Sequence, residues 1–209
     1  MTEILRSSTR RRWLRLAGGG GVALAAGGLL GACQRRTATV FHATDIRDTN
    51  IGQGWALPDA SGQMRTIADY KGKVVAVFFG FIHCPDICPT TMAELAQVRE
   101  RLGDQADRLQ VLFVTVDPER DTPEILSSYL QAFDPTAQGL RGNAEQLAAA
   151  AQTFKVFYAK VPQGEGNYTM DHSSGLYVFD GEGRIRLYSR YGQPVDQLAA
   201  DIRQLIQGS

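Results

Sequence analysis

The run Val74-Val-Ala-Val-Phe-Phe-Gly-Phe-Ile-His-Cys-Pro-Asp-Ile-Cys-Pro89 places two cysteines, Cys84 and Cys88, directly after an apolar segment of the 209-residue chain. Residues 74–79 are apolar, with β-branched and aromatic side chains, which predicts a strand covered on both faces. Residues 90–102 carry an apolar stripe at helical spacing, closed by a glycine, which predicts a helix. The cysteine pair therefore lies between a central strand and a helix.

Further elements are predicted on both sides of this unit. Short strands are expected at 54–57 and 63–66, a buried strand at 109–116, a short strand at 155–160, and a hairpin of residues 176–179 and 185–189. Helices are expected from Asp121 or Thr122 to about 133, from Asn143 to 153, and over 194–206. This order, with a redox-type motif after the first central strand, predicts a single α/β domain, a thioredoxin-like three-layer sandwich.

The first 32 residues are typical of an export signal. A basic start precedes an apolar, Gly-rich stretch over residues 16–30, which is shorter than the ~20 residues that a permanent membrane helix needs. Residues 9–15, Thr-Arg-Arg-Arg-Trp-Leu-Arg, resemble a twin-arginine export motif, with Trp13 where Phe is usual. Leu30-Gly-Ala-Cys33 resembles the bacterial lipobox, which implies that Cys33 becomes the lipid-modified first residue of the mature protein.

The predicted organisation follows from this signal. Residues 1–32 form the export signal, residues 33–50 the lipidated cysteine and a polar tether, and residues 51–209 the thioredoxin-like domain. Removing the signal takes away five Arg and one Glu, which leaves 17 basic against 21 acidic side chains. A net charge of −4 with no basic stripe argues against nucleic-acid binding.

Cys84 and Cys88 are the chemically distinctive residues of the predicted domain. Four residues of helix rise ~6 Å over little more than one turn, so both sulfurs can face one side and close either on a metal ion or as a disulfide. A position at a helix N-terminus favours a negative sulfur, so we expect thiolates near neutral pH. With so few cysteines in an exported chain, a disulfide scaffold is disfavoured and chemistry at this pair is favoured.

His172 follows Cys88 by 84 residues, in the run Met170-Asp-His-Ser-Ser-Gly175. Two soft thiolates and an imidazole suit Cu(I) and suit calcium or magnesium poorly, so copper is the expected cofactor. Residues 161–168 contain one proline and two glycines, and we expect a hinged loop there that swings His172 toward the sulfurs as a lid.

Three motifs resemble the Sco/SenC family, in the expected order over about residues 52–207. They are Phe78-Phe-Gly-Phe-Ile-His-Cys-Pro-Asp-Ile-Cys-Pro89, Val114-Thr-Val-Asp-Pro-Glu-Arg-Asp-Thr-Pro-Glu124 and Asp171-His-Ser-Ser174. The resemblance implies a membrane-tethered periplasmic chaperone that binds copper through Cys84, Cys88 and His172. It would help to build the copper A centre of cytochrome c oxidase. Its partners would be a copper donor, the copper-bearing oxidase subunit, and the membrane through Cys33.

Three other functions remain open from the residues. A thiol-disulfide oxidoreductase would use Cys84 and Cys88 as a catalytic redox pair that keeps the oxidase cysteines reduced, without need of His172. A peroxidase of the same fold is disfavoured because no Thr stands three residues before Cys84. A zinc site with an open position is the rival metal assignment.

Other polar residues near the motifs receive simpler interpretations. We expect His83 to hold the loop, His42 to be solvated in or near the tether, and Asp86 to cap the helix rather than bind metal. Asp171 is considered as a partner that orients His172. Residues 117–124 are interpreted mainly as turn and capping residues at the rim of the site.

Overall fold

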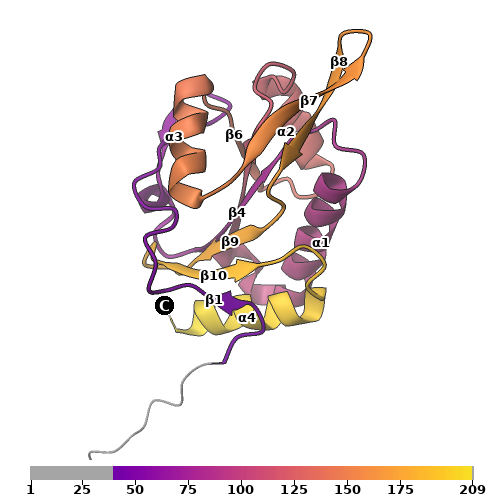
Figure 1. Cartoon of the computed structure of the whole chain (residues 1–209). Helices are drawn as coiled ribbons and strands as arrows, with labels where there is room; N and C mark the ends of the chain where they lie inside the picture. The colour runs from indigo at the N-terminus through magenta and orange to yellow at the C-terminus, as the bar shows by residue number, and fades with distance from the viewer. Residues whose placement is uncertain (1–39, 209) are drawn as a thin grey trace, which may run out of the picture. The chain divides into compact units, whose positions relative to one another are not determined.

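The structure is a computed structural model, and it describes residues 40–208. The centre of the fold is a six-stranded mixed sheet with the order β1-β10-β9-β4-β5-β6 (Figure 1). Its strands are β1 (Thr44–Asp45), β4 (Val74–Gly80), β5 (Leu109–Thr115), β6 (Gln138–Leu140), β9 (Leu176–Phe179) and β10 (Ile185–Ser189).

β4 occupies the middle of the sheet, between β5 and β9. It pairs in parallel with β5, from Val74 opposite Leu109 onward, and antiparallel with β9. Every residue of β4 and β5 is buried, as expected of strands covered on both faces. The predicted central strands are therefore confirmed, and the carboxyl end of β4 leads into the cysteine motif.

Helices cover both faces of the sheet, which confirms the predicted thioredoxin-like three-layer sandwich. They are α1 (Ile87–Leu102), α2 (Pro123–Gln131), α3 (Ala144–Phe154) and α4 (Val195–Gln207), with the short 3-10 helices η1 (Ile67–Tyr70) and η2 (Gly103–Arg108). Adjacent phenylalanines of β4 separate the faces, because successive side chains of a strand point in opposite directions. Phe78 contacts Phe113 on the side of α1 and α2, whereas Phe79 contacts Phe154 of α3. Figure 1 shows α3 across the sheet from α1 and α4.

Two helix starts have the caps that the sequence predicts. The hydroxyl of Thr122 accepts the backbone N–H of Ile125, with Pro123 at the first helical position. Asn143 and Gln146 exchange hydrogen bonds in a capping box at the start of α3. α1 begins three residues earlier than predicted, at Ile87, so Cys88 is already helical.

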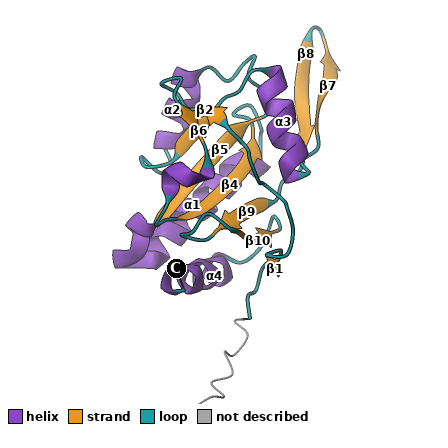
Figure 2. Cartoon of the chain, turned by 90° about the vertical axis from the view of Figure 1, so that its left-hand side faces the viewer, coloured by secondary structure: helices purple, strands orange, loops and turns teal. Residues whose placement is uncertain are grey.

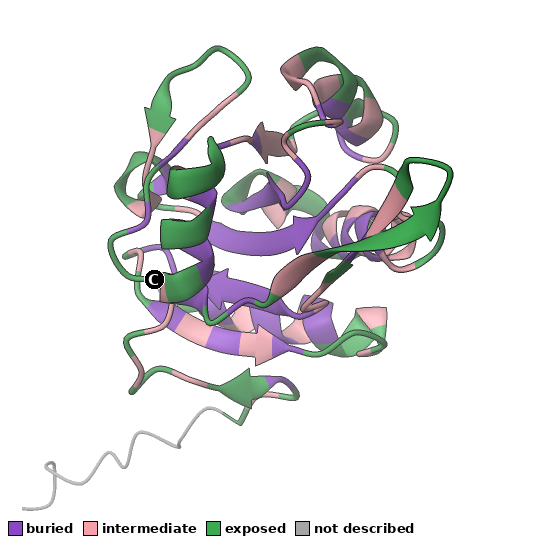
Figure 3. Cartoon of the chain, turned by 45° about the horizontal axis from the view of Figure 1, so that its top comes forward, coloured by how far each residue is buried: buried purple, intermediate pink, exposed green. Residues whose placement is uncertain are grey.

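Two small hairpins lie outside the central sheet. β2 (Leu57–Pro58) pairs with β3 (Met64–Arg65), and β7 (Tyr158–Gly164) pairs with β8 (Asn167–His172). Figure 2 shows β7 and β8 standing apart from the main sheet, and Figure 3 shows the outer part of this hairpin exposed while the central strands are buried. We call these two strands and their turn the β7–β8 hairpin.

The β7–β8 hairpin corrects two predictions. The short strand expected at 155–160 starts at Tyr158 and runs on to Gly164, and the loop expected at 161–168 is instead the paired part of the hairpin. Gly164 and Gly166, both with positive φ, form its turn on either side of Glu165. His172 is therefore the last residue of strand β8 and does not lie on an open loop.

The N-terminal boundary of the domain is also earlier than predicted. Thr44 and Asp45 pair with β10, and the backbone N–H groups of His42 and Ala43 donate to the buried carboxylate of Asp201. Residues 40–50 are thus part of the folded domain and not of a tether. The predicted export signal, Cys33 and the tether up to residue 39 lie outside the described residues. Among residues 40–208, no helix is long and apolar enough to span a bilayer.

Candidate metal centre

The two cysteines are positioned by the passage from β4 into α1. Asp86 occupies the N-cap of α1, so Cys84 lies just outside the helix and Cys88 lies in its first turn. The backbone N–H of Cys88 points at the sulfur of Cys84, 3.5 Å away. Such an N–H has no partner within the helix, and it favours negative charge on the sulfur that it faces. Both thiols are free, with Cys88 buried and Cys84 partly exposed.

Gly80, the last residue of β4, leaves the space that Cys88 needs. A Cβ at this position would lie 2.9 Å from the sulfur of Cys88 and within 3 Å of the rings of Phe78 and Phe113. Contacts this short do not occur for real Cβ atoms, so the sulfur can approach the sheet only over a glycine. This role of Gly80 is not evident from the sequence, although the residue follows directly on the apolar run of 74–79.

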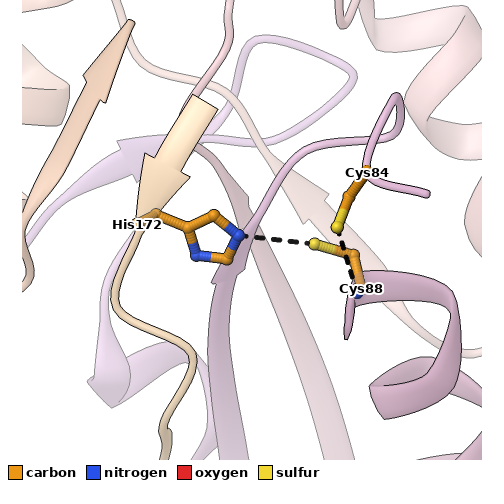
Figure 4. Close-up of side chains that lie close together, drawn as sticks. All are labelled: Cys84, Cys88 and His172. Carbon is orange, nitrogen blue, oxygen red and sulfur yellow. Dashed lines mark hydrogen bonds between the residues drawn. The ribbon is translucent and has the colours of Figure 1, made fainter. Parts of the chain in front are cut away.

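His172 brings the third donor from the end of β8. Its Nε2 lies 3.6 Å from the sulfur of Cys88. Figure 4 shows the imidazole pointing toward that sulfur. One donor atom from each of Cys84, Cys88 and His172 lies within 4.8 Å of the others. The imidazole also packs edge-to-face against Phe78 and Phe81, with ring centroids 6.2 and 5.7 Å away. The fold thus gathers two sulfurs and one nitrogen on an apolar wall.

The hydrogen bond of His172 fixes which nitrogen faces the sulfurs. Nδ1 lies 3.0 Å from the carbonyl oxygen of Ser173, and only a protonated nitrogen can donate to a carbonyl. Nε2 therefore presents its lone pair toward Cys88, in the manner of a metal-ligating histidine. Asp171, considered either as an orienting partner or as a solvated neighbour, is exposed, and the ring is oriented by the Ser173 carbonyl.

Burial sets the protonation states of the His172 imidazole and the Cys88 thiol. It lowers the pKa of His172 below its ordinary value, which keeps the imidazole neutral, and it raises the pKa of the Cys88 thiol. The expectation of easily formed thiolates is therefore wrong for Cys88, because loss of solvation outweighs the favourable helix N-terminus. A metal ion that binds here must displace the Cys88 proton.

The β7–β8 hairpin is tied to the loop after β5 through Tyr168. The Tyr168 hydroxyl donates to Asp117 at 2.9 Å, and Arg120 donates from Nε to the other oxygen of Asp117 and from Nη1 to the Tyr168 carbonyl. The guanidinium lies 3.8 Å above the Tyr168 ring, a cation–π contact. Lys160 of β7 also pairs with Glu119. Residues 117–120, interpreted as turn residues, therefore anchor the strand that carries His172.

The loop that carries Cys84 is braced by Asp121. This buried carboxylate accepts the Thr115 hydroxyl at 2.6 Å and the backbone N–H of Ile82 at 3.2 Å, both on Oδ2. Burial raises the pKa of Asp121. The sequence offers Asp121 or Thr122 as the cap of α2; the cap is Thr122, and Asp121 braces the loop, a role that its turn-forming neighbours do not indicate.

The other candidate residues lie apart from the three donors. Asp86 is exposed at the N-cap and accepts a hydrogen bond from the Thr90 hydroxyl. The side chain of His42 is exposed on a segment that packs against the domain. His83 is half exposed, with Nδ1 3.8 Å from Asp121. The exposure of His42 agrees with a solvated role, whereas Asp86 occupies the cap position of α1 without capping the helix through its side chain.

Comparison with known proteins adds a family relationship. A family model described as SCO1/SenC matches residues 43–207. Over 191 residues, the chain is 37% identical to the mitochondrial protein SCO2 homolog of Bos taurus, covering 90% of this chain and 70% of that protein. The human SCO2 homolog is 36% identical, with 76% of this chain and 61% of that protein covered. A SCO2-like protein of Rickettsia felis is 38% identical over 66% of this chain and 68% of its own length.

Solved structures agree with the sequence match. The fold is similar to Bradyrhizobium japonicum ScoI with copper bound, at 38% identity and a TM-score of 0.68, covering 74% of this chain and 99% of that one. It is also similar to yeast Sco1 with copper bound, at 29% identity and a TM-score of 0.70, covering 77% and 91% of the two chains. Copper is thus recorded in two structures that share this fold.

Proposed function

Because the chain belongs to the SCO1/SenC family, we propose that it is a copper-binding assembly factor that delivers copper to cytochrome c oxidase. The observation that carries this proposal is the convergence of Cys84, Cys88 and His172, whose donor atoms lie within 4.8 Å of one another. Two copper-bound relatives with the same fold support it.

The donor set fits a soft ion. Sulfur and imidazole nitrogen select Cu(I) over the hard cations that prefer oxygen. The neutral imidazole of His172 presents Nε2 to the pair without needing to lose a proton, since Nδ1 is the protonated nitrogen. Cys84, Cys88 and His172 would therefore hold copper as cargo, with the Phe78 and Phe81 rings keeping one side dry.

The exposure of the three donor side chains suggests the order in which they release copper. Cys88 is buried and His172 is packed against two phenylalanines, whereas Cys84 is partly exposed. An incoming thiolate from a partner would reach the Cys84 side first. Release would then proceed by exchange of one ligand at a time, and no substrate would be turned over.

The cellular setting belongs to the same proposal. The basic, apolar start of the chain and the Leu30-Gly-Ala-Cys33 run support export through the twin-arginine route and lipidation at Cys33. The copper site would then face the periplasm from a membrane anchor. Its partners would be a copper donor and the oxidase subunit that carries the copper A centre.

The rival function is a thiol-disulfide oxidoreductase. Two free thiols that lie close together support this function. One of them is partly exposed, as a thiol that attacks a disulfide must be. Against it, burial raises the pKa of Cys88, which disfavours a thiolate there. The rival needs both sulfurs but does not need His172.

Replacing His172 separates the two functions. We expect His172→Ala to weaken Cu(I) binding by more than the ~10–100-fold that loss of an outer-sphere partner costs, because a direct donor is lost. Cu(I) affinity is measured by competition with a chelator, under reducing conditions, and disulfide reductase activity is measured on the same samples. Exposed His42 is the matched control, and His42→Ala should bind Cu(I) like the parent. Unchanged Cu(I) affinity in His172→Ala would refute the proposed site.

A further inference from the structure

A second group of metal-ligating side chains lies beside the cysteine loop. His83, Asp117 and Asp121 each place a donor atom within 4.8 Å of the others, and none of them belongs to the thiol centre. Asp117 and Asp121 are buried, whereas the side chain of His83 is 52% exposed. The group therefore opens to solvent through His83.

Asp121 has one oxygen that the fold leaves unused. Oδ2 accepts hydrogen bonds from Thr115 and from the backbone of Ile82, as described above. Within residues 40–208, no group forms a hydrogen bond to Oδ1, although the side chain is fully buried. A buried carboxylate oxygen without a partner is costly, so a positive or hydrogen-bonding occupant is expected opposite it.

The atom that faces this oxygen is Nδ1 of His83, at 3.8 Å. This separation is too long for a hydrogen bond, but it suits two ligands that each lie ~2.0–2.2 Å from a shared ion. The Ile82 backbone holds the Asp121 carboxylate beside the loop that carries His83. His83 lies on the loop after β4, and Asp121 lies after β5, with Thr115 and Ile82 fixing its carboxylate.

Asp117 contributes charge rather than a free oxygen. Its Oδ2 accepts from Arg120 and its Oδ1 accepts from Tyr168, so the one guanidinium in this group already pairs with one of the two carboxylates. The second carboxylate, Asp121, has no cation other than His83 within ion-pair distance among the described residues. Among residues 40–208, Asp121 is therefore the carboxylate of this group without a guanidinium partner.

We propose that His83 and Asp121 form a second cation site, next to the thiol centre, for a divalent first-row transition ion such as Zn(II) or Cu(II). One imidazole nitrogen and one carboxylate oxygen suit such borderline ions and do not suit Cu(I), which prefers sulfur. His83 adjoins Cys84 in the chain, so an ion held there lies at the entrance to the soft site. This second site shares no donor with the thiol centre of Cys84, Cys88 and His172.

The test uses Co(II) as probe on the full chain carrying Cys84→Ala and Cys88→Ala, with folding checked by circular dichroism. We expect one Co(II) to bind, as measured by calorimetry and visible absorption. Adding His83→Ala should weaken binding by more than about tenfold, because a direct ligand is lost. Adding His42→Ala should leave the affinity unchanged.

The wild-type chain provides a second arm that does not require the cysteine variant to fold. Co(II) bound to thiolate gives sulfur-to-metal charge-transfer absorption, whereas Co(II) at His83 and Asp121 does not. We expect Co(II) added beyond the thiol-bound fraction to lack that absorption and to be lost in His83→Ala. The proposal is overturned if no such Co(II) binds in either arm, or if it binds equally well without His83. It is also overturned if removing His42 weakens binding as much as removing His83.

Discussion

The segment from β4 into α1 and the β7–β8 hairpin each bring donors to one centre, but they are built in opposite ways. The first lies in the middle of the sheet, with every residue of β4 buried, and it fixes Cys84 and Cys88 by packing. The second shares no strand pairing with the six-stranded sheet, and most of β7 is exposed. It holds His172 through a few polar and ring contacts around Tyr168. Stability and ligand geometry should therefore separate experimentally between the two regions.

The largest effect is expected from Gly80→Ala, in the packed segment. A Cβ there meets Cys88, Phe78 and Phe113 at 2.7–2.9 Å, and overpacking of this kind costs ~1–3 kcal/mol. Urea unfolding should show this loss, and Cu(I) affinity should fall with it because the Cys88 sulfur is displaced. Gly208→Ala is the control, since its Cβ would meet only a Gln204 oxygen at 3.4 Å. Equal stability of the two variants would show that the packing around Cys88 is loose.

A smaller effect on stability, but a clear one on copper, is expected from Tyr168→Ala in the hairpin. This change removes the ring under Arg120 and the hydroxyl bound to Asp117, so His172 loses its support while the main sheet is untouched. Cu(I) affinity should fall ~10-fold, as for loss of an outer-sphere partner. The urea midpoint should move less than for Gly80→Ala.

Tyr191→Ala serves as the comparison for Tyr168→Ala, because Tyr191 is 43% exposed and lies outside the network of Arg120 and Asp117. Its Cu(I) affinity should match the parent. If Tyr168→Ala bound Cu(I) normally, the hairpin would hold His172 without this network, and the contrast between the two regions would fail.

The smallest effect is the pH dependence that His172 adds to the stability of the metal-free protein. Its pKa is lowered in the folded state, so below the ordinary pKa of about 6.5 the unfolded chain binds a proton that the folded chain does not. The unfolding free energy should therefore be unaffected above that pH and should fall below it, by at most ~1.4 kcal/mol per pH unit. His172→Gln should show a shallower slope over pH 5–6.5, and coincident slopes would argue against a buried neutral imidazole.

The same contrast explains what the sequence predicts well. Continuous apolar runs predict strands β4 and β5. Helical spacing and cap residues such as Thr122 and Asn143 predict helices α2 and α3. These signals lie within short stretches of sequence, and packing against the core stabilises the elements that they predict. The order of elements then suffices for the fold class.

The sequence of the β7–β8 hairpin has no such local pattern. β7 is mostly exposed and contains Pro162, so residues 161–164 show neither alternation nor an apolar run and are expected as a hinge loop, whereas residues 158–160 fall in the predicted short strand. β1 is two residues long and exists because β10 offers an edge far along the chain. The meeting of His172 with Cys88 spans 84 residues, and no local pattern encodes it. Burial, also a product of the whole fold, reversed the expected acidity of Cys88.

The central claim is that Cys84, Cys88 and His172 hold one soft ion together. X-ray absorption of the chain loaded with one Cu(I) tests it most directly, since it counts the sulfur and nitrogen neighbours of copper. We predict two sulfurs and one nitrogen in the parent, and loss of the nitrogen in His172→Ala. Copper with sulfur neighbours alone, and the same spectrum in both proteins, would contradict the account.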